Sequence, residues 1–360
     1  MMHCSNQPAG IGIIGCGYWG MNYVRILNEL PEAKVIAVCD QREERLQEIA
    51  GRLPGIQLTT DFETLLRNDR ISAVVICTEA TSHFRIASRC LHAVKHVLIE
   101  KPLTTLSTDA EELASIAQAK SLTLMVGHTF VYNGGISAIK SVLDQRRDRI
   151  YYLHASRTNL GPIRRDVNAI WDLATHDIAI FNYLLNGVPQ WVSAVGGRVL
   201  GNCREDVAFI CLGYCDGVIG HIHVSWADPN KCREIVVVCS ERRLVFNDLN
   251  AIEPVRIYEK GVSALSEEPQ SFGEYQLKIR EGSIISPFIE PSEPLKTQCR
   301  HFLECVIHGL KPKSGAEDGV NVLLTLEAID RSIQLHGTTV KVEKHECYGH
   351  ASESAAGSAA

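Results

Sequence analysis

The run Gly12-Ile13-Ile14-Gly15-Cys16-Gly17-Tyr18-Trp19-Gly20 decides the fold of this 360-residue chain. Its glycines Gly15, Gly17 and Gly20 have the spacing of the turn that joins the first strand and first helix of a dinucleotide-binding fold. The first glycine permits the tight turn, the second lets the backbone approach a pyrophosphate, and the third lets the helix pack closely on the strand. The helix N-terminus then offers free N–H groups to the phosphates.

The next apolar run ends at Asp40, 20 residues after Gly20. A carboxylate at this place binds the ribose hydroxyls and repels a 2′-phosphate, which favours NAD over NADP, although Arg42 leaves NADP open. Further contacts are expected where later strands end, at the carboxyl edge of the sheet. The residues predicted to bind the cofactor are Gly15, Cys16, Gly17, Tyr18, Trp19, Gly20, Asp40, Arg42, Thr78, His83, Glu100 and Lys101.

Apolar runs alternate with amphipathic stretches through residues 1–127, which predicts an α/β Rossmann domain with a parallel sheet. After Asn133 the sequence changes to long runs in which apolar and polar residues partly alternate, with turn signals between some of them. This pattern predicts an α+β domain with an open, mainly antiparallel sheet over residues 128–345. Two helices at about 295–335 close this domain and are expected to pack back on the first one. Residues 346–360 are polar and small and are expected to form a disordered tail.

The bulk composition excludes several classes of protein. The formal net charge is −6, and the arginine pairs are short and mostly flanked by acids, so nucleic-acid binding is not expected. No apolar run approaches the roughly 20 residues that span a bilayer, and the N-terminus carries no signal sequence, so we expect a cytoplasmic protein. The 13 cysteines form no Cys-x-x-Cys pair and no zinc-like spacing, so we expect free thiols and no metal site.

A candidate catalytic segment begins near the middle of the chain, at Trp171 and Asp172. Asp172 and His176 are four residues apart in a segment whose apolar residues recur at helical spacing, so one helix face would carry a carboxylate beside an imidazole. His176 is the predicted general base, because imidazole titrates near neutral pH. Lys101 would donate a hydrogen bond to the same substrate oxygen. Asp172 would orient the imidazole or the lysine, and lysine remains the alternative proton acceptor.

Taken together, these motifs resemble the Gfo/Idh/MocA oxidoreductases. The resemblance rests on the glycine turn, Asp40, Glu100-Lys101-Pro102, the segment from Val126-Gly127-His128 to Tyr132-Asn133, and Asp172-Leu-Ala-Thr-His176-Asp177. It implies a Rossmann domain plus an open sheet that binds substrate and mediates assembly into a homodimer or homotetramer. It also implies a cis peptide bond before Pro102 that positions Lys101.

Residues 158–168, with the stretches at 282–287, 293–295 and 301–302, resemble the branch of the family that acts on sugar nucleotides in surface-polysaccharide and lipid A synthesis. The implied reaction is NAD-dependent oxidation of the 3-hydroxyl of UDP-N-acetylglucosamine, followed by amination by a PLP aminotransferase. Arginine suits the diphosphate, and asparagine suits sugar hydroxyls. The predicted substrate residues are His128, Asn133, Arg157, Asn159, Arg164, Arg165, Asn168, Trp171 and Tyr275.

Other functions remain open from the sequence. Within the family these are oxidation of UDP-N-acetylglucosaminuronate, reduction of a keto sugar, and dehydrogenation of inositol or a simple sugar. Outside enzymes, the same fold serves as an NAD-binding sensor, which would need neither Lys101 nor His176. For Asp172 and His176 the plain structural alternative is a surface pair on a helix.

Overall fold

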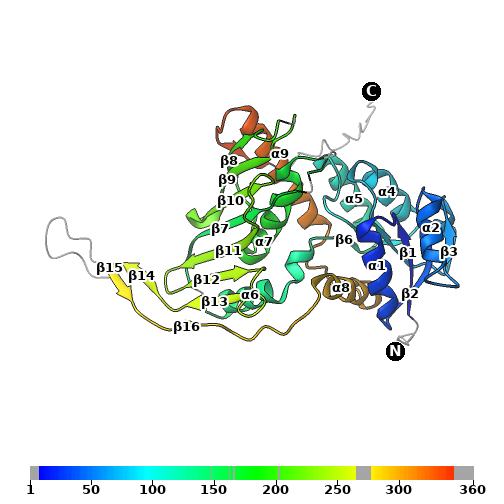
Figure 1. The fold of residues 1–360 in the computed structure, drawn as a ribbon, viewed down its shortest axis with the longest axis horizontal. Helices are drawn as coiled ribbons and strands as arrows, with labels where there is room; N and C mark the ends of the chain where they lie inside the picture. Colours follow the sequence, from blue (N-terminus) through cyan, green and yellow to red (C-terminus); the bar gives the residue numbers. More distant parts are fainter. Residues whose placement is uncertain are drawn as a thin grey trace, which may run out of the picture.

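The computed structural model describes residues 8–146, 148–161, 163–164, 167–201, 203–264 and 277–343. Two sheets lie side by side, each with its own helices (Figure 1). The blue and cyan half of the chain forms a parallel sheet, and the green and yellow half forms a larger mixed sheet. Among the described residues, no helix combines the length and the apolar character that a membrane span requires.

The first sheet is parallel, with the strand order β3-β2-β1-β4-β5-β6. The chain runs outward from β1 to β3 and then returns to β4, so the order reverses between β1 and β4, which is where ligands bind in open α/β sheets. The strands are β1 (Ala9–Ile14), β2 (Ala33–Cys39), β3 (Gln57–Thr59), β4 (Ala73–Ile76), β5 (His96–Ile99) and β6 (Leu124–Val126). The helices between them are α1 (Tyr18–Glu29), α2 (Glu43–Ala50), α3 (Glu63–Leu66), α4 (His83–His92) and α5 (Ser107–Ala119).

The second sheet has the order β16-β13-β12-β11-β7-β10-β9-β8-β17. Its described strands pair antiparallel except β7 and β10, which are parallel. The strands are β7 (Ile150–Thr158), β8 (Trp191–Gly197), β9 (Val207–Gly213), β10 (Ile219–Ser225), β11 (Cys232–Cys239), β12 (Arg243–Asn247), β13 (Val255–Tyr258), β16 (Ile284–Ile285) and β17 (Val340–Lys341). A separate ribbon of β14 (Gly261–Ala264) and β15 (Leu277–Arg280) extends from its end (Figure 1). The predicted fold class is confirmed.

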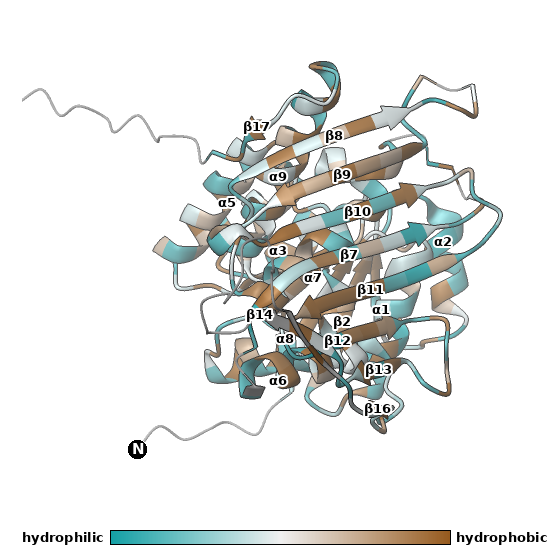
Figure 2. Cartoon of the chain, turned by 90° about the vertical axis from the view of Figure 1, so that its left-hand side faces the viewer, coloured by the Kyte–Doolittle hydropathy of each residue, from teal (hydrophilic) through white to brown (hydrophobic). Residues whose placement is uncertain are grey.

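Within the part of the chain that the structure describes, helices cover one face of the large sheet and leave the opposite face open (Figure 2). The covering helices are α6 (Gly134–Arg146), α7 (Thr175–Leu185) and α9 (Ala316–Gln334). Apolar side chains on the inward positions of the strands, such as Ile210, Ile222 and Ile235, are fully or almost fully buried. The alternation along each strand therefore produces one core face and one exposed face.

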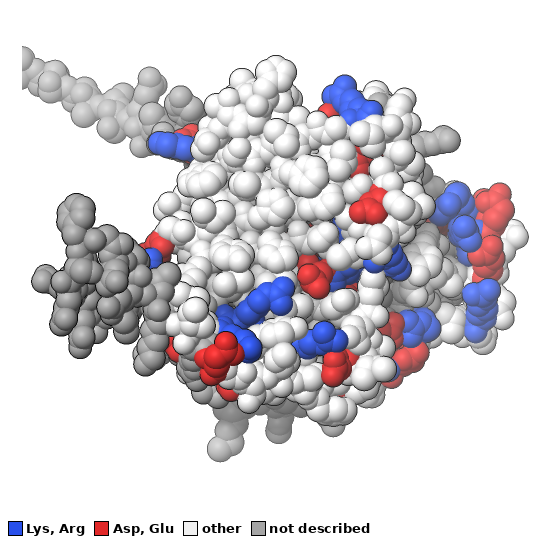
Figure 3. Space-filling model, turned by 60° about the vertical axis from the view of Figure 1, so that its left-hand side comes forward, with Lys and Arg blue, Asp and Glu red and all other residues white. Residues whose placement is uncertain are grey.

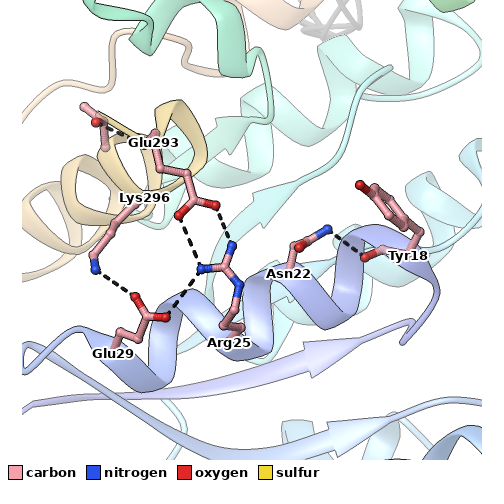
Figure 4. A network of polar contacts seen from close by, with 7 residues as sticks. Tyr18, Asn22, Arg25, Glu29, Glu293 and Lys296 are labelled. Atoms are coloured by element: carbon pink, nitrogen blue, oxygen red, sulfur yellow. Dashed lines mark hydrogen bonds and ion pairs between the residues drawn. The ribbon is translucent and has the colours of Figure 1, made fainter. Parts of the chain in front are cut away.

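A network of charges ties α8 (Pro294–His308) to α1 of the first domain (Figure 4). Arg25 of α1 pairs with Glu29 on its own helix and with Glu293 at the start of α8, while Lys296 reaches back to Glu29 at 2.7 Å. The side chains are substantially exposed, so the network orients the two helices more than it stabilises the fold.

Two local features differ from the sequence prediction, and one agrees. The strand β3 has three residues and contains no recognisable apolar run, so it was not predicted from the sequence. The motif segment is not a regular α-helix from its start, because Ile170–Ala174 forms a π-helical turn, η3, before α7 begins at Thr175. The Lys101–Pro102 peptide bond is cis, as the family resemblance implied.

Candidate active site

The glycine turn has the geometry that a dinucleotide requires. Gly15 adopts φ +91°, which L side chains rarely adopt, and a Cβ at Gly20 would lie 1.9 Å from the Gly15 carbonyl oxygen. A Cβ at Gly17 would meet nothing within 4 Å, so the backbone there faces open space at the start of α1. Tyr18 and Trp19 follow in the first turn of the helix, with 80% and 47% of their surfaces exposed. The turn thus leaves free backbone for a ligand to approach.

Asp40 stands at the end of β2 and links this strand to the glycine turn. Its carboxylate accepts hydrogen bonds from the Cys16 N–H at 2.7 Å and the Arg42 N–H at 2.9 Å. The Arg42 guanidinium adds two more, at 3.1 and 3.2 Å. Burial would raise the pKa of Asp40, but these hydrogen bonds outweigh it and lower the pKa, so the carboxylate stays ionised.

The carboxyl ends of β4 and β5 carry two of the predicted cofactor residues, Glu100 and Thr78. Glu100 is buried and accepts a hydrogen bond from the Tyr23 hydroxyl at 2.8 Å, and burial raises its pKa. Thr78 accepts a hydrogen bond from the Ser82 hydroxyl at 2.8 Å.

His83 does not face the cofactor in the way that the sequence suggested. Its Nδ1 lies 2.8 Å from the Pro102 carbonyl oxygen, and its Nε2 lies 3.1 Å from the Thr78 carbonyl oxygen. The residue is 1% exposed and burial lowers the pKa of its imidazole, so the neutral ring can donate to only one of these two carbonyl oxygens. His83 therefore holds the loop around the cis peptide rather than a ligand.

Lys101 meets Asp172 where the two domains adjoin. The Lys101 Nζ donates to the Asp172 Oδ1 at 2.9 Å and to the Asp172 carbonyl oxygen at 2.7 Å. Arg164 donates to the same Oδ1 at 3.2 Å. Burial would raise the pKa of Asp172, but Lys101 and then Arg164 lower it, so the aspartate is a carboxylate between two cations.

His176 lies in the first turn of α7, close to this pair. Its Nδ1 is buried and has no hydrogen-bond partner among the described residues, and the ring packs edge-on against Phe130 at 5.0 Å between centroids. Burial and then the cations Lys101 and Arg157 hold the pKa of His176 well below its usual value. The imidazole is therefore neutral at physiological pH, which is the form that a general base must have. Asp172 was expected to orient either the imidazole of His176 or the ammonium of Lys101, and the geometry favours the ammonium.

A buried ion pair between Arg157 and Asp177 joins α7 to β7. The Arg157 guanidinium donates to both oxygens of Asp177 at 2.7 to 3.1 Å, and its carbon lies 4.3 Å from the centre of the Phe130 ring. Arg157 was predicted to hold a diphosphate, but its guanidinium is instead paired with Asp177 in the interior. Sequence reasoning missed Phe130, since no local pattern marks it, and set Asp177 aside from the chemistry.

The remaining predicted substrate residues are dispersed around the site. Asn133 donates to Asp248 at 3.2 Å and caps the Gly135 N–H, which gives it a structural role. Asn159 donates to the Gly161 carbonyl oxygen in its own loop. His128 is 2% exposed, and neither of its ring nitrogens has a partner among the described residues.

Asn168 and Trp171 brace the π-helical turn. The Asn168 Oδ1 accepts the Trp171 N–H at 3.0 Å, and its Nδ2 donates to Glu205 at 3.2 Å. The Trp171 Nε1 donates to Asp330 of α9 at 2.7 Å. Both side chains are thereby engaged in packing the turn against its neighbours. Arg165 and Tyr275 lie outside the described residues.

These residues fit NAD. The open backbone at Gly17, the start of α1 and the ionised Asp40 lie along the edge that leads to Lys101, so one ligand in extended form can contact all of them. Within the described ranges, no group of His, Cys, Asp or Glu is arranged to hold a metal ion.

Comparison with known proteins agrees with this geometry. Residues 9–128 match the model of the Gfo/Idh/MocA oxidoreductase family with an NAD-binding Rossmann fold, and residues 134–245 match a C-terminal domain model of the same family. Inositol 2-dehydrogenase 2 of Paenarthrobacter aurescens is 25% identical over 93% of this chain and 99% of its own length. UDP-N-acetylglucosamine 3-dehydrogenase of Acidithiobacillus ferrooxidans is 26% identical over 71% of this chain and 78% of its own length.

Solved structures resemble the whole fold. A crystal structure of that A. ferrooxidans dehydrogenase superposes with a TM-score of 0.76 at 22% identity, covering 91% of this chain and 98% of the other. GenD2 from gentamicin A biosynthesis, in complex with NAD, superposes with a TM-score of 0.78 at 23% identity, covering 94% and 97%. At these identities the likeness concerns the fold.

Proposed function

The chain belongs to the Gfo/Idh/MocA family of NAD-dependent oxidoreductases, which act on CH–OH groups of sugars and polyols, and from that premise we propose that its substrate is a nucleotide sugar. The proposed reaction is oxidation of the 3-hydroxyl of a UDP-N-acetylhexosamine, with UDP-N-acetylglucosamine first among candidates. The observation that carries this choice is the position of Arg164. Its guanidinium borders Asp172, and its side chain is 32% exposed, so it faces both the reacting centre and solvent.

The chemistry follows from how Lys101 and His176 are placed. A lysine ammonium has three donors, and Asp172 accepts two of them, which leaves one for the substrate hydroxyl oxygen. His176 is neutral and takes the proton from that hydroxyl. Bound NAD supplies the hydride acceptor for the carbon that carries the hydroxyl. The products are the 3-keto sugar, NADH and the proton held by His176.

Asp172 serves this step by holding the lysine. As a carboxylate between Lys101 and Arg164, it keeps the ammonium aimed at one point and neutralises part of its charge. Burial of His176 among cations keeps its imidazole neutral before substrate arrives. The two groups therefore complement each other: one donates to the oxygen while the other removes its proton.

Arg164 is the residue that supports a sugar nucleotide, rather than a free polyol, as the substrate. A guanidinium binds phosphate oxygens in pairs, whereas free inositol offers no such group. The similarity to the UDP-N-acetylglucosamine enzyme of A. ferrooxidans points the same way, while the similarity to inositol dehydrogenases keeps the polyol as the second candidate. A PLP aminotransferase would then be the enzyme that consumes the keto sugar.

The test is NADH formation on a panel of substrates. We expect absorbance at 340 nm to rise with NAD and UDP-N-acetylglucosamine, and more slowly or not at all with free N-acetylglucosamine, UDP-N-acetylglucosaminuronate or inositol. Arg164→Ala should raise the KM for the UDP-sugar about tenfold, the loss of one charge-assisted contact. Arg256→Ala, at an exposed arginine of β13, is the matched control. Equal activity on free and UDP-linked sugar, or no effect of Arg164→Ala, would refute the nucleotide assignment.

We also propose that the open face of the large sheet joins two copies of the chain. Large apolar side chains are exposed there: Tyr152 at 46%, Val195 at 52%, Phe209 at 47% and Ile219 at 47%. Much of this side of the molecule carries no charged side chain (Figure 3). An exposed face that carries several large apolar side chains and little charge is typical of a protein interface. A Phe209→Lys variant should shift the mass measured by light scattering towards the monomer, and a wild-type monomer would refute the proposal.

A further inference from the structure

Arg233 of β11 borders the reacting centre on the side of His176. It stands directly opposite Arg157 of β7 in the sheet, so both side chains project from the face that α7 covers. The Arg233 guanidinium carbon lies 5.8 Å from the centre of the Phe130 ring, against which the His176 ring packs edge-on. Arg233 is also among the cations that lower the pKa of His176, after the larger effect of burial.

The guanidinium of Arg233 is accessible, whereas that of its neighbour is not. The Arg157 side chain is 6% exposed, and its Nε and Nη2 both donate to Asp177. The Arg233 side chain is 37% exposed, and its Nη1 donates to the Asp248 Oδ2 at 3.2 Å. Its Nε and Nη2 have no protein partner among the described residues and are not buried. These N–H groups can therefore donate to a bound substrate.

Asp248, which follows β12, fixes where this guanidinium points. It accepts Arg233 at Oδ2 and the Asn133 Nδ2 at Oδ1, at 3.2 Å each, and its own N–H donates to the Arg233 carbonyl oxygen at 3.0 Å. Asn133 is held in turn, because its Oδ1 accepts the Gly135 N–H at the start of α6. The arginine is thus oriented before a substrate arrives, so less side-chain freedom is lost on binding.

The balance of charge at Arg233 favours a neutral partner. Lys101 and Arg164 share the single carboxylate of Asp172, so positive charge is in excess on that side of the site. Within the described part of the chain, Asp248 pairs with no cation other than Arg233, so this pair has no net charge. A phosphate or carboxylate placed at Arg233 would also face Asp248, and like charges repel. Because a guanidinium only donates, the group that fits is a neutral oxygen acceptor.

A 2-acetamido sugar that is oxidised at C3 offers such an acceptor at this place. Its acetamido group is carried by C2, the carbon next to the one that loses the hydride. The amide carbonyl oxygen is therefore close to the hydroxyl that Lys101 and His176 would contact. An amide carbonyl only accepts hydrogen bonds, which matches a group that only donates them. The carboxylate of a uronate is carried by C5 instead, and Asp248 would repel it at Arg233.

We propose that Arg233 is a specificity-determining residue that donates to the acetamido carbonyl oxygen of the substrate and so selects N-acetylated hexosamines over hexoses with a 2-hydroxyl. This inference rests on the proposed oxidation of a UDP-sugar at C3 and assigns the contact that recognises its C2 substituent. Asp248 is then a positioning residue, because it holds Arg233 without touching the sugar.

The test compares kcat/KM for UDP-N-acetylglucosamine and UDP-glucose, with NAD, in matched variants. We expect the wild type to prefer the acetylated sugar. Arg233→Met keeps an unbranched side chain over Phe130 but removes the donors, so the preference should fall about 10- to 100-fold, the range for a hydrogen bond to a charged group. A packing defect alone would lower kcat/KM for both sugars and leave their ratio unchanged. Arg256→Met is the matched control, since Arg256 has similar exposure and also pairs with a carboxylate, and it should keep the wild-type ratio.

Arg233→Lys covers the case in which Arg233→Met does not fold. It keeps the ion pair with Asp248, but an ammonium lacks the planar set of donors, so the preference should still fall several-fold. An unchanged preference in either folded variant would overturn the inference. So would a wild-type enzyme that oxidises UDP-sugars without preferring the acetylated one, and this result would leave the proposed oxidation of a UDP-sugar standing. A wild-type enzyme that oxidises neither UDP-sugar would overturn the proposed function and the inference with it.

Discussion

Lys101 holds Asp172 through two bonds, one to the carboxylate and one to the main-chain carbonyl of the same residue. The two residues are 71 positions apart and come from different domains. The contact therefore depends on correct docking of both sheets, and the ammonium cannot turn away from the site without breaking two hydrogen bonds.

Replacing Lys101 by methionine should reduce kcat about 10²- to 10³-fold, the usual loss on removing a donor to a developing oxyanion. The fold should persist, because Arg164 still pairs with Asp172. NAD affinity, measured by calorimetry, should change little. Lys120→Met, at an exposed lysine after α5, is the control and should retain wild-type turnover. An active Lys101→Met enzyme would contradict the role given to the ammonium.

Replacing His176 by glutamine should lower kcat about 10²- to 10⁴-fold, the range for loss of a general base. The pKa of His176 is lowered by burial, so the wild-type imidazole is still neutral at pH 6.5 and becomes protonated only at a lower pH. The acid limb of the kcat/KM profile should therefore lie below pH 6.5 and disappear in His176→Gln. A profile that rises only above pH 8 in both proteins would favour lysine as the proton acceptor.

Asp40 and Arg42 together set the choice of cofactor. In the wild-type protein the Arg42 guanidinium donates two hydrogen bonds to the Asp40 carboxylate. Asp40→Ala removes the acceptor for the ribose hydroxyls and releases this guanidinium. We expect kcat/KM to fall about tenfold with NAD and to rise with NADP, whose 2′-phosphate can pair with the free arginine. Asp40→Asn, which keeps an acceptor for the Cys16 N–H, should lose less activity with NAD. Unchanged NADP kinetics in Asp40→Ala would show that Arg42 does not reach the phosphate.

Asp330 makes the stability of the fold depend on pH. Burial raises its pKa to about 6, despite the hydrogen bond from Trp171. The unfolded value is about 3.9, so the folded protein binds the proton more tightly, and this contribution to stability is lost as pH rises from about 4 to about 6. Asp330→Asn removes the penalty, so its Tm relative to wild type should be higher at pH 7.5 than at pH 4. Asp216→Asn, on an exposed turn, should show the same difference at both pH values.

The sequence predicted those parts of the site that depend on local geometry. The glycine turn and Asp40 lie within one strand-helix-strand unit, whose shape follows from spacing alone. The resemblance to the family supplied Lys101, whose distance from Asp172 along the chain hides the contact.

Contacts made by packing could not be predicted in this way. The Arg157–Asp177 pair and the Trp171–Asp330 hydrogen bond join residues 20 and 159 positions apart, and nothing in either segment announces its partner. His83 is a further case. Its position at the edge of the sheet suggested either a helix start or a ligand contact, and the structure places its ring nitrogens beside the carbonyl oxygens of Pro102 and Thr78.

The π-helical turn Ile170–Ala174 carries a consequence for how this site can change over time. The Asp172 carbonyl oxygen belongs to this turn and accepts a hydrogen bond from Lys101. Every amino acid has a main-chain carbonyl oxygen, so one of the two hydrogen bonds that hold Lys101 does not depend on which residue stands at position 172. A scan of point substitutions would therefore underestimate how much the site depends on this turn. Inserting or deleting one residue between 170 and 174 would instead remove both hydrogen bonds that hold Lys101. What the lineage must preserve here is a length of chain as much as a side chain.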